Sequence, residues 1–331
     1  MAVRMKCGAL VVLAAVLGSM IPSGISAQDT SSGSEGALFL LLPVGARTIG
    51  MARAGTATMG PESVWWNPAG LAGQEESRID VFRGEDLAGD ATALSGLVAD
   101  SNLGTLGLSY MLFDGGTQDF RDAQGNFLGT ASYRNHLGIV SAASEILPDL
   151  ALGLNFKVIQ SRFACRGQCV DAGITATTWA VDLGAQWRDV LSLPVTLGAA
   201  LVHLGGDLQV FNEEQADPLP TRIRVAAAWD LLSHWIELED VHGILTVELE
   251  DRWKDVGSPA TYIGAELSAG TTQAIFVRAG YAFGAQLQVD GAGVGVGIRY
   301  DRFDVGIAKS LASSSLVGDS EPVQISLGFI L

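Results

Sequence analysis

From residue 76 onward, apolar residues alternate with small or polar residues in one short segment after another. In the stretch 294–299, three β-branched residues alternate with two glycines and an arginine, and the same period of two runs through 150–158, 179–187 and 222–229. A period of two places successive side chains on opposite faces of a β-strand. The pattern therefore predicts strands that have one apolar face and one polar face.

The number and spacing of these segments indicate how the strands are arranged. There are about 14 of them, an even number that falls within the range of single-chain outer-membrane barrels. Short and long connections alternate between them, as periplasmic turns and outer loops do in such barrels, with 231–241 as the main exception and 113–132 as the longest predicted outer loop. We therefore predict an all-β fold, a transmembrane antiparallel β-barrel over residues 76–331. The segments begin near Ser77, Ala91, Leu103, Tyr133, Asp149, Thr175, Pro194, Thr221, His242, Pro259, Gln273, Gly291, Phe303 and Glu321.

Composition excludes two other classes of protein. Beyond the first 27 residues no apolar stretch approaches the roughly 20 residues that a membrane-spanning helix requires, and the 41 glycines disfavour long helices. This argues against a helical membrane protein. The 36 acidic against 20 basic side chains give a net charge of -16, which argues against nucleic acid as a partner because phosphate binding requires a basic surface.

Charged residues within the predicted strands fall on the polar face. A charge that faces lipid at the middle of a bilayer costs about 2 to 4 kcal/mol, so we expect these side chains to face the lumen. Both signs occur, which favours salt bridges over an ion filter of one sign and predicts a polar lumen without a continuous apolar path. The predicted lumen charges are Lys157, Asp182, Arg222, Arg224, Glu248, Glu250, Glu266, Arg278, Arg299 and Asp304. Aromatic residues of an interfacial girdle are expected at the inner strand ends, at Trp187, Trp229, Tyr300 and Phe303.

The amino end is typical of an export signal. Arg4 and Lys6 precede an apolar segment at 9–21, and Ala27 is a small residue before a cleavage site at Gln28. Residues 1–27 are therefore predicted to be a signal peptide, and the polar, serine-rich stretch 28–36 a flexible lead-in. Together with the barrel, the signal predicts a protein of the cell outer membrane.

Two cysteines remain after the signal peptide, which contains Cys7. Cys165 and Cys169 are separated by three residues in a chain predicted to be exported to an oxidising compartment. Two thiolates with no histidine nearby are half of a zinc site. We therefore expect a small disulfide loop rather than a metal site.

The sequence contains no recognisable catalytic motif. The stretch 291–297 lacks the last glycine of a dinucleotide-binding GxGxxG motif, the histidines have no HExxH spacing, and no serine lies in a GxSxG elbow. The oxygen-rich stretch 122–126 departs from the calcium-loop pattern and is expected to be a hairpin tip. The sequence predicts no enzyme, no metal and no cofactor.

Residues 37–75 differ from the rest because they do not alternate. The apolar run 38–42 is too short to cross a membrane, and Trp65 and Trp66 are too apolar to remain in water, so we expect this segment to be a plug buried inside the barrel. Asn67 precedes Pro68, a combination that favours a tight turn. Two interpretations of this turn stay open, because it either anchors the plug to the lumen wall or starts the first strand.

Two motifs in this segment resemble a known family. The run Phe39-Leu40-Leu41-Leu42-Pro43-Val44-Gly45-Ala46-Arg47, followed by Val64-Trp65-Trp66-Asn67-Pro68-Ala69-Gly70-Leu71-Ala72, is similar to the amino-terminal signature of the PorV/PorQ family of outer-membrane proteins, which belong with the FadL-type transporters of hydrophobic compounds. The stretches 120–130 and 218–222 are similar to further parts of that family. The resemblance implies a barrel of about 14 strands with an amino-terminal plug, in which Asn67-Pro68-Ala69 matches the family's NPA turn. The carboxyl end departs from the usual assembly signal, since Leu331 rather than an aromatic residue is last.

Three functional hypotheses follow. In the first, the protein assists type IX-like secretion or surface attachment, with secretion machinery or exported cargo as partners at the outer loops and lipid around the barrel. In the second, it is a FadL-like passive transporter of hydrophobic molecules. The third, a soluble lectin-like or enzymatic domain, is disfavoured because it explains neither the sorting of the loops nor the apolar outer face. The predicted outer loops and the polar lumen favour the first hypothesis.

Overall fold

The computed structural model describes residues 35–86, 89–101, 103–168, 173–209, 216–232, 240–284, 290–311 and 323–331. The predicted signal peptide and most of the predicted lead-in therefore lie outside the described residues. Glu35 and Gly36, the last two residues of the lead-in, are described, and the Gly36 amide donates a hydrogen bond to the Pro218 carbonyl at 2.9 Å.

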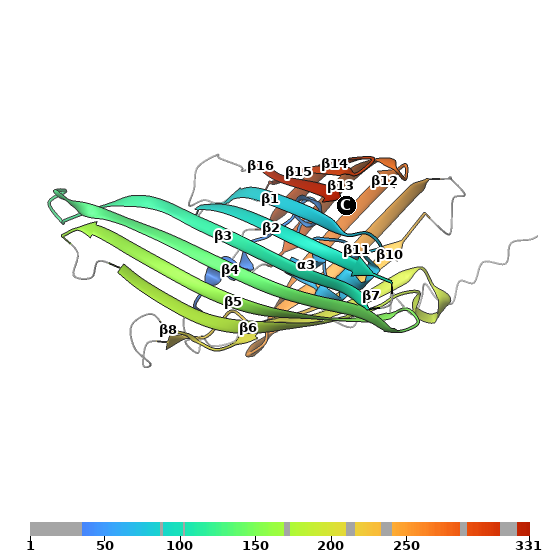
Figure 1. The fold of residues 1–331 in the computed structure, drawn as a ribbon, viewed down its shortest axis with the longest axis horizontal. Helices are drawn as coiled ribbons and strands as arrows, with labels where there is room; N and C mark the ends of the chain where they lie inside the picture. The colour runs from blue at the N-terminus through green and yellow to red at the C-terminus, as the bar shows by residue number, and fades with distance from the viewer. Residues whose placement is uncertain are drawn as a thin grey trace, which may run out of the picture. The chain divides into compact units, whose positions relative to one another are not determined.

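Fourteen antiparallel strands form a closed barrel, in which β1 pairs with both β2 and β16 (Figure 1). The sequence prediction of an antiparallel barrel of about 14 strands is confirmed. Closure satisfies the backbone groups that an open sheet would leave unpaired at its edges. The strands are β1 (Arg78–Asp86), β2 (Gly89–Asp100), β3 (Gly104–Arg121), β4 (Phe127–Leu147), β5 (Leu150–Gly167), β6 (Gly173–Trp187), β7 (Val195–Gly205), β10 (Arg222–Asp230), β11 (Val241–Arg252), β12 (Asp255–Ala269), β13 (Gln273–Phe283), β14 (Gly291–Tyr300), β15 (Phe303–Ser310) and β16 (Val323–Ile330).

The remaining elements are short. A separate pair of two-residue strands, β8 (Leu208–Gln209) and β9 (Ala216–Asp217), lies between β7 and β10 in the sequence. The helices are η1 (Leu38–Leu41), α2 (Ala46–Gly50), α3 (Ser63–Trp66), η2 (Pro68–Gly73) and η3 (Val190–Ser192). Within the described part of the chain, no helix combines the length and the apolar character needed to cross a membrane.

The two faces of the strands follow the alternation in the sequence. On the outward face, apolar side chains such as Leu152, Val225 and Val296 are 43%, 46% and 53% exposed. Residues on the inward face are mostly buried, as the alternating burial of β6 and β14 illustrates. The aromatic residues at the inner strand ends include Trp187 and Tyr300, which are exposed on the outward face.

The stretch 113–132 is not the loop that the sequence predicted. β3 continues to Arg121 and β4 begins at Phe127, so most of this stretch is an extended hairpin with a register shift between Asp114 and Thr117. Its tip is a tight turn, in which the Asp122 side chain accepts hydrogen bonds from the amides of Gln124 and Asn126. The prediction failed because the glycines and polar residues here resemble a loop, whereas cross-strand pairing keeps the backbone extended.

Residues 37–75, which we call the lumen segment, lie inside the barrel. The Ala46 amide donates to Ser326 Oγ on β16 at 2.8 Å, the Thr56 amide donates to Glu248 Oε2 on β11 at 2.8 Å, and the Val64 carbonyl accepts from Asn155 Nδ2 on β5 at 2.9 Å. These strands stand on different sides of the ring. The segment therefore spans the interior from one wall to another.

Candidate functional site

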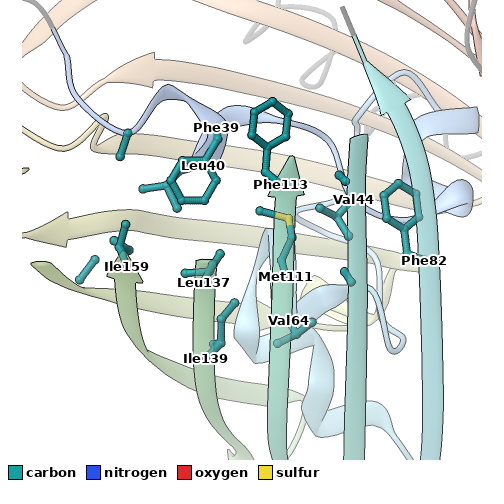
Figure 2. Close-up of a cluster of buried hydrophobic side chains, with 14 of the residues drawn as sticks. Phe39, Leu40, Val44, Val64, Phe82, Met111, Phe113, Leu137, Ile139 and Ile159 are labelled. Atoms are coloured by element: carbon teal, nitrogen blue, oxygen red, sulfur yellow. The ribbon is translucent and has the colours of Figure 1, made fainter. Parts of the chain in front are cut away.

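One side of the lumen is lined by large apolar side chains from the inward faces of β1, β3, β4 and β5. None of them is more than 5% exposed. They contact apolar residues of the lumen segment, among them Phe39, Leu40 and Val44, and the rings of Phe39 and Phe113 stack with centroids 6.4 Å apart (Figure 2). We call these strand residues the apolar wall, consisting of Phe82, Met111, Phe113, Leu137, Ile139 and Ile159.

Sequence reasoning missed the apolar wall. On β4, Leu137 and Ile139 face inward while Val140 on the opposite face is 57% exposed, so both faces of this strand carry apolar residues. A strand with two apolar faces loses the contrast that marks a lumen-facing position. The signal that was available is the absence of charged residues from the buried inward positions of β2, β3 and β4, compared with the later strands.

The remainder of the lumen carries the charges predicted from the sequence. All of them lie on inward faces, from β5 round to β15, and most are buried. Glu250, Arg299 and Asp304 retain partial exposure, with side chains 11%, 37% and 21% exposed. We call the ten predicted residues the charged wall, comprising Lys157, Asp182, Arg222, Arg224, Glu248, Glu250, Glu266, Arg278, Arg299 and Asp304.

A buried cluster on β5–β7 begins the charged wall. Lys157 Nζ lies 2.6 Å from Asp182 Oδ2 and 3.2 Å from His203 Nδ1. Asp182 also accepts hydrogen bonds at 2.8 Å from Asn155 Nδ2 and from the His203 amide. His203 has a φ of 61° beside a register shift in β7, and this local distortion turns its amide toward the carboxylate. The cluster is satisfied internally, which lets two opposite charges remain buried.

Ion pairs connect the charged wall to the lumen segment and to the end of the lead-in that precedes it. Arg47 binds Glu266 through two hydrogen bonds of 2.9 and 2.8 Å, and Arg278 adds a third at 2.5 Å. Arg222 binds Glu35 in the same two-pronged manner at 2.8 and 2.7 Å. Bidentate arginine–carboxylate pairs fix orientation as well as distance. Arg47 and Glu35 were not predicted, because partners this far apart in the chain leave no sequence pattern.

Further polar contacts hold two other points of the segment. Thr56 donates from its amide and its hydroxyl to Glu248 at 2.8 and 2.7 Å. Arg224 Nε lies 2.6 Å from Glu250 Oε2, and its guanidinium is 5.0 Å from the Trp66 ring centroid. The charged wall therefore contacts the segment through directional bonds.

Glu62 organises the lumen segment from within. Its carboxylate accepts hydrogen bonds from the amides of Arg47 and Thr48 at 3.0 and 2.9 Å, which are among the unpaired N–H groups at the start of helix α2. Burial raises the pKa of the Glu62 carboxyl above its usual range, and the hydrogen bonds from Thr48 and Arg47 oppose this rise only in part.

The Asn67-Pro68-Ala69 turn contacts the barrel wall. Asn67 Oδ1 accepts from the Ala69 amide at 3.1 Å, and Nδ2 donates to the carbonyls of Thr56 at 2.8 Å and of Ala185 on β6 at 3.2 Å. The first strand begins only at Arg78, so the turn does not start it. Glycine is required opposite the turn, because a Cβ at Gly184 would collide with Asn67 Oδ1. The geometry suits an anchor between segment and wall.

The two tryptophans before this turn have different surroundings. Trp66 is 4% exposed, and its Nε1 donates to the Val44 carbonyl at 2.9 Å. The guanidinium of Arg53 lies 5.6 Å from the Trp66 ring centroid. Trp65 is partly buried and packs against the apolar cluster that contains the apolar wall.

A cavity of about 350 Å³ lies between the lumen segment and strands β1 and β12–β16. Near the inner strand ends it is lined by Arg78, Asp80, Arg299 and Asp304, which form an ion-pair network with distances of 2.6 to 2.9 Å. Trp65 and the apolar-wall residue Phe82 also line it, so the cavity is bordered by both kinds of wall. We call it the inner cavity. Arg78 and Asp80 were missed because they lie at the first strand, where the alternation is only beginning.

The structure describes one of the two cysteines of the predicted disulfide. Cys165 at the outer end of β5 is disulfide-bonded. Cys169 lies outside the described residues, so the pairing of these two cysteines stays a prediction. Among the described residues, no group of three or more His, Cys, Asp or Glu side chains is placed to hold a metal ion.

Comparison with known proteins gives similarity in structure but not in sequence. No family model and no curated protein sequence matches the chain. The fold is similar to that of the toluene transporter TbuX from Ralstonia pickettii (TM-score 0.55, 12% identity, covering 86% of this chain and 97% of that one). It is also similar to that of the CymD monoaromatic hydrocarbon channel (TM-score 0.58, 11% identity, covering 90% of this chain and 98% of that one). A FadL homologue from Pseudomonas aeruginosa has a similar fold as well (TM-score 0.51, 9% identity, covering 87% of this chain and 98% of that one). At these identities the likeness concerns the fold.

Proposed function

We propose that this protein is a non-enzymatic outer-membrane channel through which small apolar molecules cross passively. The observation that carries the proposal is the apolar wall, a continuous buried surface along one side of the lumen. A polar channel has no use for such a surface, whereas an apolar solute gains roughly 25 cal/mol for each Å² of its surface that leaves water. The similar folds of hydrocarbon channels support the same substrate class.

The lumen segment occupies the route that a solute would take. Phe39 and Leu40 of helix η1 cover the outer part of the apolar wall, and Val64 covers a deeper part. An apolar molecule that displaces Phe39 from Phe113 replaces one apolar contact by another, so the exchange costs little free energy. Beyond the wall, the solute reaches the inner cavity beside Trp65 and Phe82.

The outward face supports a location in the outer membrane. Its strands expose apolar residues over their central parts, and the charges described above are inside. We expect the protein to fractionate with outer membranes and to migrate differently in gels before and after heating, because a closed barrel resists detergent until heated. Recovery in the soluble periplasmic fraction would contradict this location.

Uptake by intact cells tests the channel function. Cells that lack their own hydrocarbon channels and express the protein should take up labelled toluene faster than the same cells without it. A small polar solute such as labelled glycerol serves as the control and should enter at the same rate in both. Equal toluene uptake with and without folded protein in the outer membrane would contradict the proposal.

The secretion hypothesis is weaker than the sequence indicated. It depended on long outer loops and on the absence of an apolar path through the lumen, and the apolar wall removes the second of these arguments. The similar structures described above are named as a toluene transporter, a hydrocarbon channel and a FadL homologue, and they give it no support.

A further inference from the structure

Three arginines gather on the outward face of the barrel, at the outer parts of β4 and β5. Arg134 and Arg162 are directly opposite each other across the two strands, and Arg166 follows four residues later on the same face of β5. The register between these strands is regular here, so Arg162 and Arg166 share a face with Phe156 and Val158. We call Arg134, Arg162 and Arg166 the outer arginine patch. It lies outside the lumen, on the same surface as the exposed apolar side chains of the strands, such as Leu152, Phe156 and Val158, which we call the apolar belt.

Within the part of the chain that the structure describes, the charge of this patch is balanced only in part. Arg134 Nε lies 2.9 Å from Asp114 Oδ2, but Arg162 and Arg166 have no ion pair among the residues that the structure describes. All three side chains are exposed. Like charges directly opposite each other on neighbouring strands are destabilising. In a chain with 36 acidic and 20 basic residues, two arginines that have no acidic partner among the described residues, beside a third arginine, favour an anion from outside the protein.

The patch begins where the apolar belt ends. On β5, Val158 is 47% exposed and is the last apolar residue before Gln160 and Arg162 on this face. Arg162 is four residues beyond Val158, which corresponds to about 13 Å along a strand. Tyr110 on β3 and Trp179 on β6, the strands that flank β4 and β5, lie at the edge of the belt and are 44% and 52% exposed. Aromatic residues in such positions are typical of a membrane interface. The arginines are therefore at the level of lipid headgroups.

We propose that the outer arginine patch binds the phosphate groups of a phosphorylated glycolipid in the outer leaflet. The proposal rests on the outer-membrane location that forms part of the proposed function. Guanidinium groups form two parallel hydrogen bonds to phosphate, and the apolar belt directly below supplies the surface for the acyl chains of the same molecule. A lipid satisfies both surfaces at once, whereas a free phosphate would use only the arginines.

Native mass spectrometry of the purified protein tests this site. The probes are bis-phosphorylated lipid A, dephosphorylated lipid A and inorganic phosphate. The test variant is Arg162→Gln combined with Arg166→Gln, and the control is Arg121→Gln, which removes another exposed arginine, one that is paired with Asp119 near the hairpin tip. Both should retain heat-modifiable migration, since all three positions are exposed.

The wild-type protein and the control should retain bis-phosphorylated lipid A, and the double variant should bind it at least about tenfold more weakly. Dephosphorylated lipid A should bind all three proteins weakly and equally. Equal affinity of the wild-type protein and the double variant for lipid A would overturn the proposal, and so would full displacement of the lipid by inorganic phosphate. Toluene uptake should be unchanged in the double variant, so a failure of wild-type uptake would contradict the channel function and not the lipid site.

Discussion

The apolar wall and the charged wall line one lumen, yet they hold the lumen segment by different means. Against the apolar wall, contact is made by side chains, as where Phe39 stacks on Phe113. On the side of the charged wall, the contacts are ion pairs and close approaches between the backbone of the segment and the backbone of the strands. At Gly280, for example, an added Cβ would lie 2.6 Å from the Met51 carbonyl oxygen. The first kind of contact has no required direction, whereas the second fixes atoms in place.

This difference suggests a division of roles. A non-directional contact can be exchanged for an equivalent contact with a solute, but a buried arginine–carboxylate pair has no equivalent in an apolar molecule. In the proposed function, the charged wall therefore anchors the segment, and the apolar wall is the surface that a solute shares. The following changes are chosen to affect one wall and to leave the other intact.

Removal of residues 37–75 should have the largest effect. The barrel strands pair with one another and not with this segment, so the shortened protein should still insert and show heat-modifiable migration. In planar bilayers it should conduct small ions, whereas the full-length protein should be nearly closed. Unchanged conductance of a correctly folded deletion variant would show that the segment closes nothing.

Lys157→Met should be the most damaging single substitution among those considered. It leaves Asp182 buried without its cation, and breaking a buried pair in this way costs about 3 to 5 kcal/mol of unfolding free energy. Leu137→Met is the matched change on the apolar wall and should cost less than about 1.5 kcal/mol, because volume and polarity are kept. Urea unfolding in lipid vesicles measures both, and equal losses would remove the distinction between the walls.

Glycine substitutions test the close approach of backbone. Gly280→Ala places a Cβ against the Met51 backbone, which cannot move aside, so we expect a cost of about 1 to 3 kcal/mol. At Gly107, near the apolar wall, the nearest atom to a new Cβ is Leu97 Cδ2 at 2.9 Å, the flexible end of a side chain. Gly107→Ala should therefore be tolerated. The rate of amide hydrogen exchange around Met51 should rise in Gly280→Ala and stay unchanged in Gly107→Ala. A similar rise in both variants would argue against a difference in rigidity between the two walls.

The sequence predicted the frame of this molecule better than its interior. The alternation of apolar and polar residues located the strands. Because a charge such as that of Asp182 is costly on the lipid face, the same alternation assigned the charged wall to the inward face. The pairing of those charges could not be predicted, since Arg47 and Glu266 are 219 residues apart. The apolar wall was missed because apolar residues on both faces of β4, such as Leu137 and Val140, hide which face is inside.

Toluene uptake by cells that carry a variant of each wall tests the central claim most directly. Leu137→Asn places a polar group of similar size on the apolar wall and should slow uptake about tenfold, equivalent to about 1.4 kcal/mol. Met111→Gln provides a second variant if the first fails to fold. Arg299→Gln changes the charged wall where the side chain is 37% exposed and leaves Asp304 paired with Arg78, so uptake should stay within about twofold of wild type. Slower uptake in Arg299→Gln than in both apolar-wall variants, with all proteins folded, would contradict the assignment of the solute to the apolar wall.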